Sequence, residues 1–118
     1  MRLENQVICV LGGMGYIGSH TIKTLQGAGA HVISVDRRHV PQNDLRGVEY
    51  IKGEYQDEFI LDSLRHRVDG FVLCAGDSLV GPSIENPSQY YNNNVAGVIK
   101  FMDHLRHWDT KPWIVFSS

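Results

Sequence analysis

Four glycines near the start of the chain have the spacing of a phosphate-binding turn. They lie in the segment Gly12-Gly-Met-Gly15-Tyr-Ile-Gly18, which satisfies G-x-G-x-x-G through Gly13, Gly15 and Gly18 and G-x-x-G-x-x-G through Gly12. Where a strand turns sharply into a helix, a backbone without side chains allows a pyrophosphate to approach the helix N-terminus. Free N–H groups and the positive end of the helix dipole then face the anion. The segment therefore predicts a pyrophosphate site.

An acidic residue follows the glycines at the distance typical of dinucleotide-binding proteins. Asp36 lies about 20 residues after Gly15, at the end of a predicted strand, where its carboxylate can accept hydrogen bonds from ribose hydroxyls. A carboxylate at this place repels the 2′-phosphate of NADP, so NAD is the predicted cofactor. Arg37 and Arg38 follow immediately, and they either bind such a phosphate through a guanidinium or form the solvated start of a loop.

Two other interpretations of this pattern stay open from the residues alone. Glycine occurs in many turns, so the segment can be a strand–helix turn that binds no ligand. Methyltransferases also have a glycine-rich loop and an acidic strand end at these places. The position of the glycines between a strand and a helix, together with Asp36, favours the dinucleotide site over both.

The hydrophobic pattern predicts the elements that position these residues. Near-continuous apolar runs indicate strands buried on both faces, and apolar residues at helical spacing indicate the helices between them. The predicted strands are residues 6–11, 31–35, 48–52, 70–75 and 113–116, and the predicted helices are residues 16–28, 57–67 and 88–108. This alternation predicts an α/β fold, a Rossmann-type doubly wound parallel sheet of about five strands. The strand order 3-2-1-4-5 follows by analogy with Rossmann domains.

Two of these helices have apolar faces that the spacing assigns to particular residues. In the helix 57–67 the apolar side is formed by Phe59, Ile60 and Leu64. In the helix 88–108 apolar residues repeat at intervals of three and four, which predicts a buried stripe. The residues of this stripe are Tyr91, Val95, Val98, Met102 and Leu105.

Composition narrows the class of protein. The 118 residues are 42% hydrophobic and 20% charged, with no repeat or linker, so residues 1–118 are expected to form one domain. The net charge of −2 and the single basic cluster 37–39 predict no nucleic-acid partner. No apolar run reaches the roughly 20 residues needed to span a bilayer, and the first residues do not resemble a signal peptide. We therefore predict a cytoplasmic protein with no membrane partner.

The two cysteines are expected to be structural. Cys9 lies in the apolar run VICVL and Cys74 in FVLCA, and cysteine in such a run is usually a small core residue. Two isolated thiols give neither the pattern of a disulfide framework nor that of a metal site. The sequence therefore predicts no disulfide and no metal ion.

Several segments together resemble the UDP-glucose (UDP-galactose) 4-epimerases of the extended short-chain dehydrogenase/reductase group. The segment Gly12-Gly-Met-Gly-Tyr-Ile-Gly-Ser-His20 is similar to the GGxGYIGSH opening of that family. Similar segments continue to the end of the chain, and the string Tyr90-Tyr-Asn-Asn-Asn94-Val95 resembles one that is fairly specific to the sugar-nucleotide members. The other similar segments are Gly53-Glu54, Cys74-Ala75-Gly76, Val80-Gly-Pro-Ser83 and Phe116-Ser-Ser118.

This resemblance implies the residues of an NAD site. The residues of the glycine segment between Gly12 and Gly18 would line the pyrophosphate, and Asp36 would hold the adenosine ribose. Glu54 and Tyr55 would contact the adenine, Tyr55 through its backbone. The segment 74–76 would lie along the middle of the cofactor, and Asn94 would reach the nicotinamide side unless it is a polar helix residue facing water. The implied cofactor-binding residues are Gly12, Gly15, Tyr16, Ile17, Gly18, Asp36, Arg37, Glu54, Tyr55, Cys74, Ala75, Gly76, Asn94 and Ser117.

The chain departs from the family pattern at four positions near this site. Leu11 replaces the Thr that usually precedes the glycine loop, and Glu54 is one methylene longer than the usual Asp. Ser78 stands where these epimerases have a Lys near the nicotinamide ribose, and Asp77 adds a negative charge beside it. The change at Leu11 removes a hydroxyl that braces the turn, the change at Ser78 removes a charge-assisted contact, and Asp77 places a negative charge close to an anionic cofactor.

The catalytic pair of the family is missing from the sequence. In the family a Tyr-x-x-x-Lys pair on a later helix performs the acid–base step, and no Tyr here is followed four residues later by Lys. We therefore expect an NAD-binding part, truncated before the catalytic Tyr-Lys helix and the sixth strand, that is catalytically inactive. The alternatives are a stand-alone NAD(P)-binding sensor or regulatory module and one half of a split nucleotide-sugar epimerase. A homo-oligomer formed through the 88–108 helix and an exposed sheet face is also expected.

Overall fold

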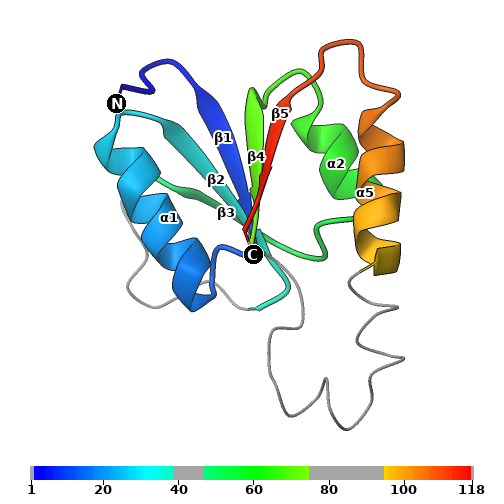
Figure 1. The fold of residues 1–118 in the computed structure, drawn as a ribbon, viewed down its shortest axis with the longest axis horizontal. Helices are drawn as coiled ribbons and strands as arrows, with labels where there is room; N and C mark the ends of the chain where they lie inside the picture. The colour runs from blue at the N-terminus through cyan, green and yellow to red at the C-terminus, as the bar shows by residue number, and fades with distance from the viewer. Residues whose placement is uncertain (1, 39–46, 75–94, 118) are drawn as a thin grey trace, which may run out of the picture.

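The computed structural model describes residues 2–38, 47–74 and 95–117 (Figure 1). The described part has five strands, all parallel, in the order β3-β2-β1-β4-β5. The strands are β1 (Val7–Leu11), β2 (His31–Asp36), β3 (Glu49–Lys52), β4 (Gly70–Leu73) and β5 (Trp113–Phe116), and the helices are α1 (Tyr16–Gly27), α2 (Glu58–Leu64) and α5 (Gly97–Leu105). The predicted α/β fold class and strand order are confirmed.

The helices cover the two faces of the sheet unequally. Figure 1 shows α1 on one face and α2 with α5 on the other. Each face has its own buried cluster, because side chains alternate between the faces of a strand. Ile8, Val10, Ile22, Leu25, Ala30 and Val32 form the cluster under α1. The larger cluster under α2 and α5 contains Cys9, Leu11, Ile33, Val35, Tyr55, Leu61, Leu64, Val68, Phe71, Leu73, Phe101, Leu105 and Trp108.

Helix α2 is shorter than predicted and is rotated relative to the predicted face. It begins after Asp57, whose carboxylate accepts from the N–H groups of Phe59 at 2.8 Å and Ile60 at 3.3 Å. It ends at Leu64 because the following residues leave helical geometry, and His66 has a positive φ of 69°. Phe59 is 86% exposed and Leu61 is buried, so the assignment of Phe59 to the apolar side was wrong.

Helix α5 lies within the predicted helix 88–108, of which residues 88–94 are outside the described residues. It ends at Leu105, and the Lys111 ammonium donates to the carbonyl oxygens of Leu105 and Arg106 just beyond that end. Its buried face is formed by Gly97, Phe101 and Leu105. The predicted stripe was wrong at two described positions, because Val95 is 53% and Met102 42% exposed.

No helix in the described part of the chain is long and apolar enough to cross a membrane.

Candidate functional site

The glycine segment forms the turn between β1 and α1, at the carboxyl edge of the sheet. Gly12 has a φ of +88°, a left-handed conformation that glycine adopts without steric cost. Its N–H donates to the carbonyl oxygen of Val35 at 2.7 Å, so the loop starts against the end of β2. Its own carbonyl oxygen accepts from the N–H of Gly15 at 3.3 Å, which closes the turn before the helix begins.

Two of the glycines are required by packing inside the turn. A Cβ on Gly18 would overlap the carbonyl oxygen of Gly12 and lie 2.8 Å from the Cα of Gly13, so the first turn of α1 presses directly on the loop. A Cβ on Gly13 would overlap the hydroxyl of Ser34, which is buried and has no hydrogen-bond partner among the described residues. These contacts hold the loop at a fixed distance from both β2 and α1.

Gly15 has a different role, because it leaves the start of α1 open. It is the N-cap residue of α1 and has no side chain to accept from the first helical N–H groups. The first turn of α1 also contains no acidic residue. An α-helix leaves its first N–H groups without partners inside the helix, and its dipole places partial positive charge there. An anionic group at this point would accept from the free N–H groups and would be attracted by the partial positive charge.

Asp36, the last residue of β2, is tied directly to this loop. Its side chain is only 6% exposed, and its Oδ2 accepts from the N–H of Met14 at 3.0 Å. Burial opposes ionisation of this carboxyl group, but hydrogen bonds from Arg38 and from the Met14 N–H outweigh burial and hold its pKa below the usual value. Asp36 is therefore a carboxylate at neutral pH, fixed beside the glycine turn.

Arg38 donates hydrogen bonds to both oxygens of the same carboxylate. Its Nε is 3.2 Å from Oδ1 of Asp36, its Nη2 is 3.2 Å from Oδ2, and its backbone N–H donates to Oδ1 at 2.9 Å. The backbone contact two residues after the acid is an Asx-type turn, which Asp favours. Of the two adjacent arginines singled out in the sequence, Arg38 contacts Asp36, and the role implied for Arg37 toward the cofactor stays a prediction.

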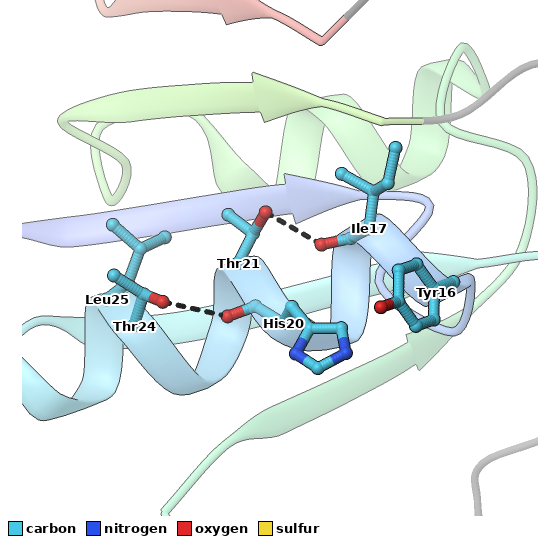
Figure 2. Close-up of a pocket in the computed structure, with 6 residues that line it drawn as sticks. All are labelled: Tyr16, Ile17, His20, Thr21, Thr24 and Leu25. Atoms are coloured by element: carbon cyan, nitrogen blue, oxygen red, sulfur yellow. Dashed lines mark hydrogen bonds between the residues drawn. The ribbon is translucent and has the colours of Figure 1, made fainter.

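Two predicted residues at the start of α1 point outward. Tyr16 is 81% and Ile17 51% exposed, and their side chains border a shallow depression of about 340 Å³ along α1. Figure 2 shows this depression, in which Thr21 donates to the carbonyl oxygen of Ile17 at 2.8 Å and Thr24 to that of His20 at 3.0 Å. The depression is formed by a single helix and contains no converging charged groups.

The remaining predicted residues lie after the ends of β3, β4 and β5. The segment containing Glu54 follows Gly53, whose N–H donates to the carbonyl oxygen of Asp36 at 2.8 Å; Glu54 itself is exposed. The Tyr55 ring is buried 5.9 Å from the ring of Phe101, so only its backbone is left for the implied adenine contact. Burial, followed by the charge of Glu54, raises the pKa of Tyr55.

The ends of β4 and β5 are held to the sheet by their backbones. The N–H of Cys74 donates to the carbonyl oxygen of Leu11 at 2.8 Å, and the N–H of Ser117 to that of Leu73 at 3.0 Å. Cys74 is half-buried, and burial raises the pKa of its thiol. The other predicted residues and the two departures in the following loop lie outside the described residues; these are Ala75, Gly76, Asp77, Ser78 and Asn94.

Sequence reasoning missed the buried Ser34 and the contact between Arg38 and Asp36. The contact had a usable signal, since an Asp two residues before Arg38 favours an Asx-type turn that brings the two together. Ser34 was visible as the one polar residue within the apolar run of β2. Within the described part of the chain, no group of three or more His, Cys, Asp and Glu side chains is arranged to hold a metal ion.

Comparison with known proteins identifies the family. Residues 8–118 match the profile of the NAD dependent epimerase/dehydratase family, which is nearly the whole chain. The chain belongs to this family. The resemblance of this epimerase/dehydratase chain to UDP-glucose 4-epimerases is therefore confirmed.

The chain covers different shares of the individual relatives' lengths. It is 39% identical over 114 residues to UDP-glucose 4-epimerase of Halalkalibacterium halodurans, covering 94% of this chain and 34% of that protein. A Klebsiella pneumoniae sequence named UDP-glucose 4-epimerase is 33% identical, and 88% of it is covered. The crystal structure of UDP-glucose 4-epimerase from Brucella ovis in complex with NAD superposes with a TM-score of 0.82 at 32% identity, over 96% of this chain and 35% of that one. The chain thus spans about a third of most of these relatives.

Proposed function

We propose that this chain is an NAD-binding unit whose cofactor lies across the carboxyl ends of β1 and β2. The single observation that carries the proposal is the hydrogen bond from the Met14 N–H to Asp36. It joins the open helix N-terminus and the buried carboxylate into one site, and those two groups would bind the pyrophosphate and the adenosine ribose of a dinucleotide. A relative of the same fold, the Brucella ovis enzyme, was crystallised in complex with NAD, which supports the proposal.

Each part of the site would perform a distinct task toward NAD. The N–H groups at the start of α1 would donate to the pyrophosphate, and Gly15 would let it approach without a side chain in between. Asp36 would accept from the ribose hydroxyls, and the backbone after Gly53 would border the adenine. When bound, the nicotinamide ring is the group that accepts or donates a hydride.

We further propose that this chain binds the cofactor without catalysing a reaction on a sugar. Acid–base catalysis needs a proton-transferring side chain within hydrogen-bond reach of the substrate. The Tyr-x-x-x-Lys pattern implied by the family does not occur in these 118 residues. The epimerase activity named for the relatives therefore requires residues that this sequence does not contain.

The test is a calorimetric titration of the purified chain with NAD, beside two variants of the site. Gly15→Val would place a branched side chain at the start of α1, and Asp36→Ala would remove the ribose acceptor, so each is expected to weaken NAD binding roughly tenfold or more. Gly27→Ala, at the far end of the same helix where a Cβ meets nothing within 4 Å, is the control and should bind like the wild type. A folded chain that does not bind NAD would contradict the proposal.

Self-association through α5 is a third proposal. Ile99 and Met102 are 61% and 42% exposed and lie three residues apart on one side of α5, and Val95, just before the helix, is 53% exposed. Such an apolar stripe is typical of a helix that packs against another surface. Sedimentation at tens of micromolar is expected to show an oligomer that Ile99→Glu dissociates, while Phe59→Glu on α2 leaves it intact. A monomeric wild-type chain would rule the proposal out.

A further inference from the structure

Arg38 occupies both oxygens of the carboxylate that a ribose would need. The two oxygens of Asp36 accept from the Met14 N–H, the Arg38 N–H, and the Nε and Nη2 of Arg38. An ionised carboxylate has about four lone-pair positions, so these donors fill it. A ribose hydroxyl can donate to Asp36 only after the guanidinium has moved away.

The same guanidinium also borders the glycine turn. Its Nη2 lies 3.2 Å from the position that a Cβ would take on Gly15, so it stands between the ribose acceptor and the start of α1. A guanidinium has five N–H donors in a planar fork, and the Asp36 carboxylate takes two of them. The others fit a phosphate group, which guanidinium forks bind through paired hydrogen bonds.

We propose that Arg38 sets the discrimination of this site between NAD and NADP, an inference that rests on the proposed dinucleotide site. Arg38 competes with an unmodified ribose for Asp36, which lowers the affinity for NAD. It donates to a ribose 2′-phosphate, which offsets the repulsion between that phosphate and Asp36. Both effects move the ratio of the two affinities in the same direction, toward the phosphorylated cofactor.

The Arg38 side chain is a suitable target for substitution because it is 58% exposed and outside both buried clusters. Arg38→Ala removes the whole side chain, and Arg38→Gln keeps part of its stem without the charge. Arg106→Ala is the control, since it removes one positive charge from a 69% exposed side chain that pairs with Asp103 just after the end of α5.

The experiment measures the dissociation constants of NAD and NADP for the full 118-residue chain and these three variants. Arg38→Ala and Arg38→Gln should each tighten NAD binding about threefold and weaken NADP binding about tenfold, in line with loss of a partly exposed ion pair and of a charge-assisted phosphate contact. Arg106→Ala should leave the ratio of the two constants within about twofold of the wild type, a difference too small to reflect a direct contact.

The outcomes separate this inference from the function on which it rests. Dinucleotide binding with a ratio that neither Arg38 variant changes beyond twofold overturns the role of Arg38 and leaves the cofactor site standing. An equal change in Arg106→Ala also overturns it, because the effect would then be one of general charge. A folded wild-type chain that binds neither NAD nor NADP removes the proposed function and the inference together.

Discussion

Strands β1 and β5 are both short apolar runs, yet their environments are opposite. In β1 the residues from Ile8 to Leu11 are 0% exposed, whereas in β5 Trp113 is 40%, Val115 52% and Phe116 54% exposed. The difference follows from position, because β1 pairs with β2 and β4 in the middle of the sheet and α1 covers its side, while β5 is the last strand of the described sheet (Figure 1). Hydrophobicity predicts the strand, and the neighbouring elements decide whether it is buried.

This difference locates the candidate site in the most constrained part of the molecule. The glycine turn is fixed by contacts with β2 and with α1, and Asp36 is buried beside it. A site that must hold two groups in register benefits from such packing, because its geometry is set before the ligand arrives. Substitutions in the middle of the sheet should therefore have large effects, and matched substitutions at its rim should have small ones.

The largest expected difference is between two phenylalanines on adjacent strands. Phe71 on β4 is 0% exposed and packs between the rings of Phe101 and Trp108, at 5.1 and 5.8 Å, while Phe116 on β5 is 54% exposed. Phe71→Ala should lower the free energy of unfolding by roughly 3–5 kcal/mol, and Phe116→Ala by less than about 1 kcal/mol. Urea denaturation of both variants measures the two changes; equal losses would show that β5 is as buried as β4.

The next comparison uses the two ends of α1. Gly18 lies against the glycine turn with no room for a Cβ, whereas a Cβ on Gly27 meets nothing within 4 Å. Gly18→Ala should destabilise the fold by roughly 1–3 kcal/mol through overpacking, and Gly27→Ala should stabilise it by up to about 1 kcal/mol through helix propensity. The midpoint of thermal unfolding should therefore fall for Gly18→Ala and rise for Gly27→Ala. A neutral Gly18→Ala would mean that the turn is not packed against the helix.

Much of the architecture was predictable because it depends on local patterns. The parallel pairing and the place of the glycine turn follow from apolar runs separated by helical spacing, whereas the strand order was expected only by analogy with Rossmann domains. The faces of α2 and α5 were harder, since Phe59, Val95 and Met102 are apolar but exposed, and hydrophobic spacing alone cannot separate a helix face buried in the core from one left at the surface.

The candidate site was predictable to a similar degree. The glycines and Asp36 were found because their spacing is fixed by the chemistry of a dinucleotide, and the Met14 hydrogen bond shows that they do meet. The hydrogen bonds from the Arg38 side chain to Asp36 depend on side-chain direction after the strand, which composition does not contain. Likewise, the buried hydroxyl of Ser34 under Gly13 depends on how closely the turn packs on β2.

A smaller difference is expected between two charged pairs, one at the carboxyl end of β2 and one at the amino end of β3. Asp36 is buried and pairs with the more exposed Arg38, whereas Glu49 and Arg67 are both about half exposed, with a closest N–O distance of 3.0 Å. Asp36→Asn should cost roughly 1–2 kcal/mol at pH 7, and Glu49→Gln less than about 0.5 kcal/mol. Urea denaturation at pH 7 measures both changes.

The cost of Asp36→Asn should also depend on pH. Despite burial, hydrogen bonds hold the pKa of folded Asp36 below that of the unfolded chain, so its carboxylate stabilises the fold fully above the unfolded value of about 3.9. This stabilisation is lost as the pH falls through the folded pKa. The difference between wild type and variant should therefore shrink in acid, and a difference that is constant from pH 7 to pH 3 would contradict it.

The finest comparison is between the two thiols, which report on the interior and the edge of the sheet without altering either. Cys9 on β1 is 0% exposed, and burial raises its pKa far above the usual range; Cys74, after β4, is half-buried with a smaller upward shift of its pKa. Since the thiolate is the reactive form, a disulfide reagent should modify Cys74 slowly and Cys9 only on unfolding. Labelling of the native chain should therefore stop at a single thiol, and Cys74→Ser should abolish it. Rapid modification of Cys9 would mean that β1 opens, and with it the turn that is proposed to hold the cofactor.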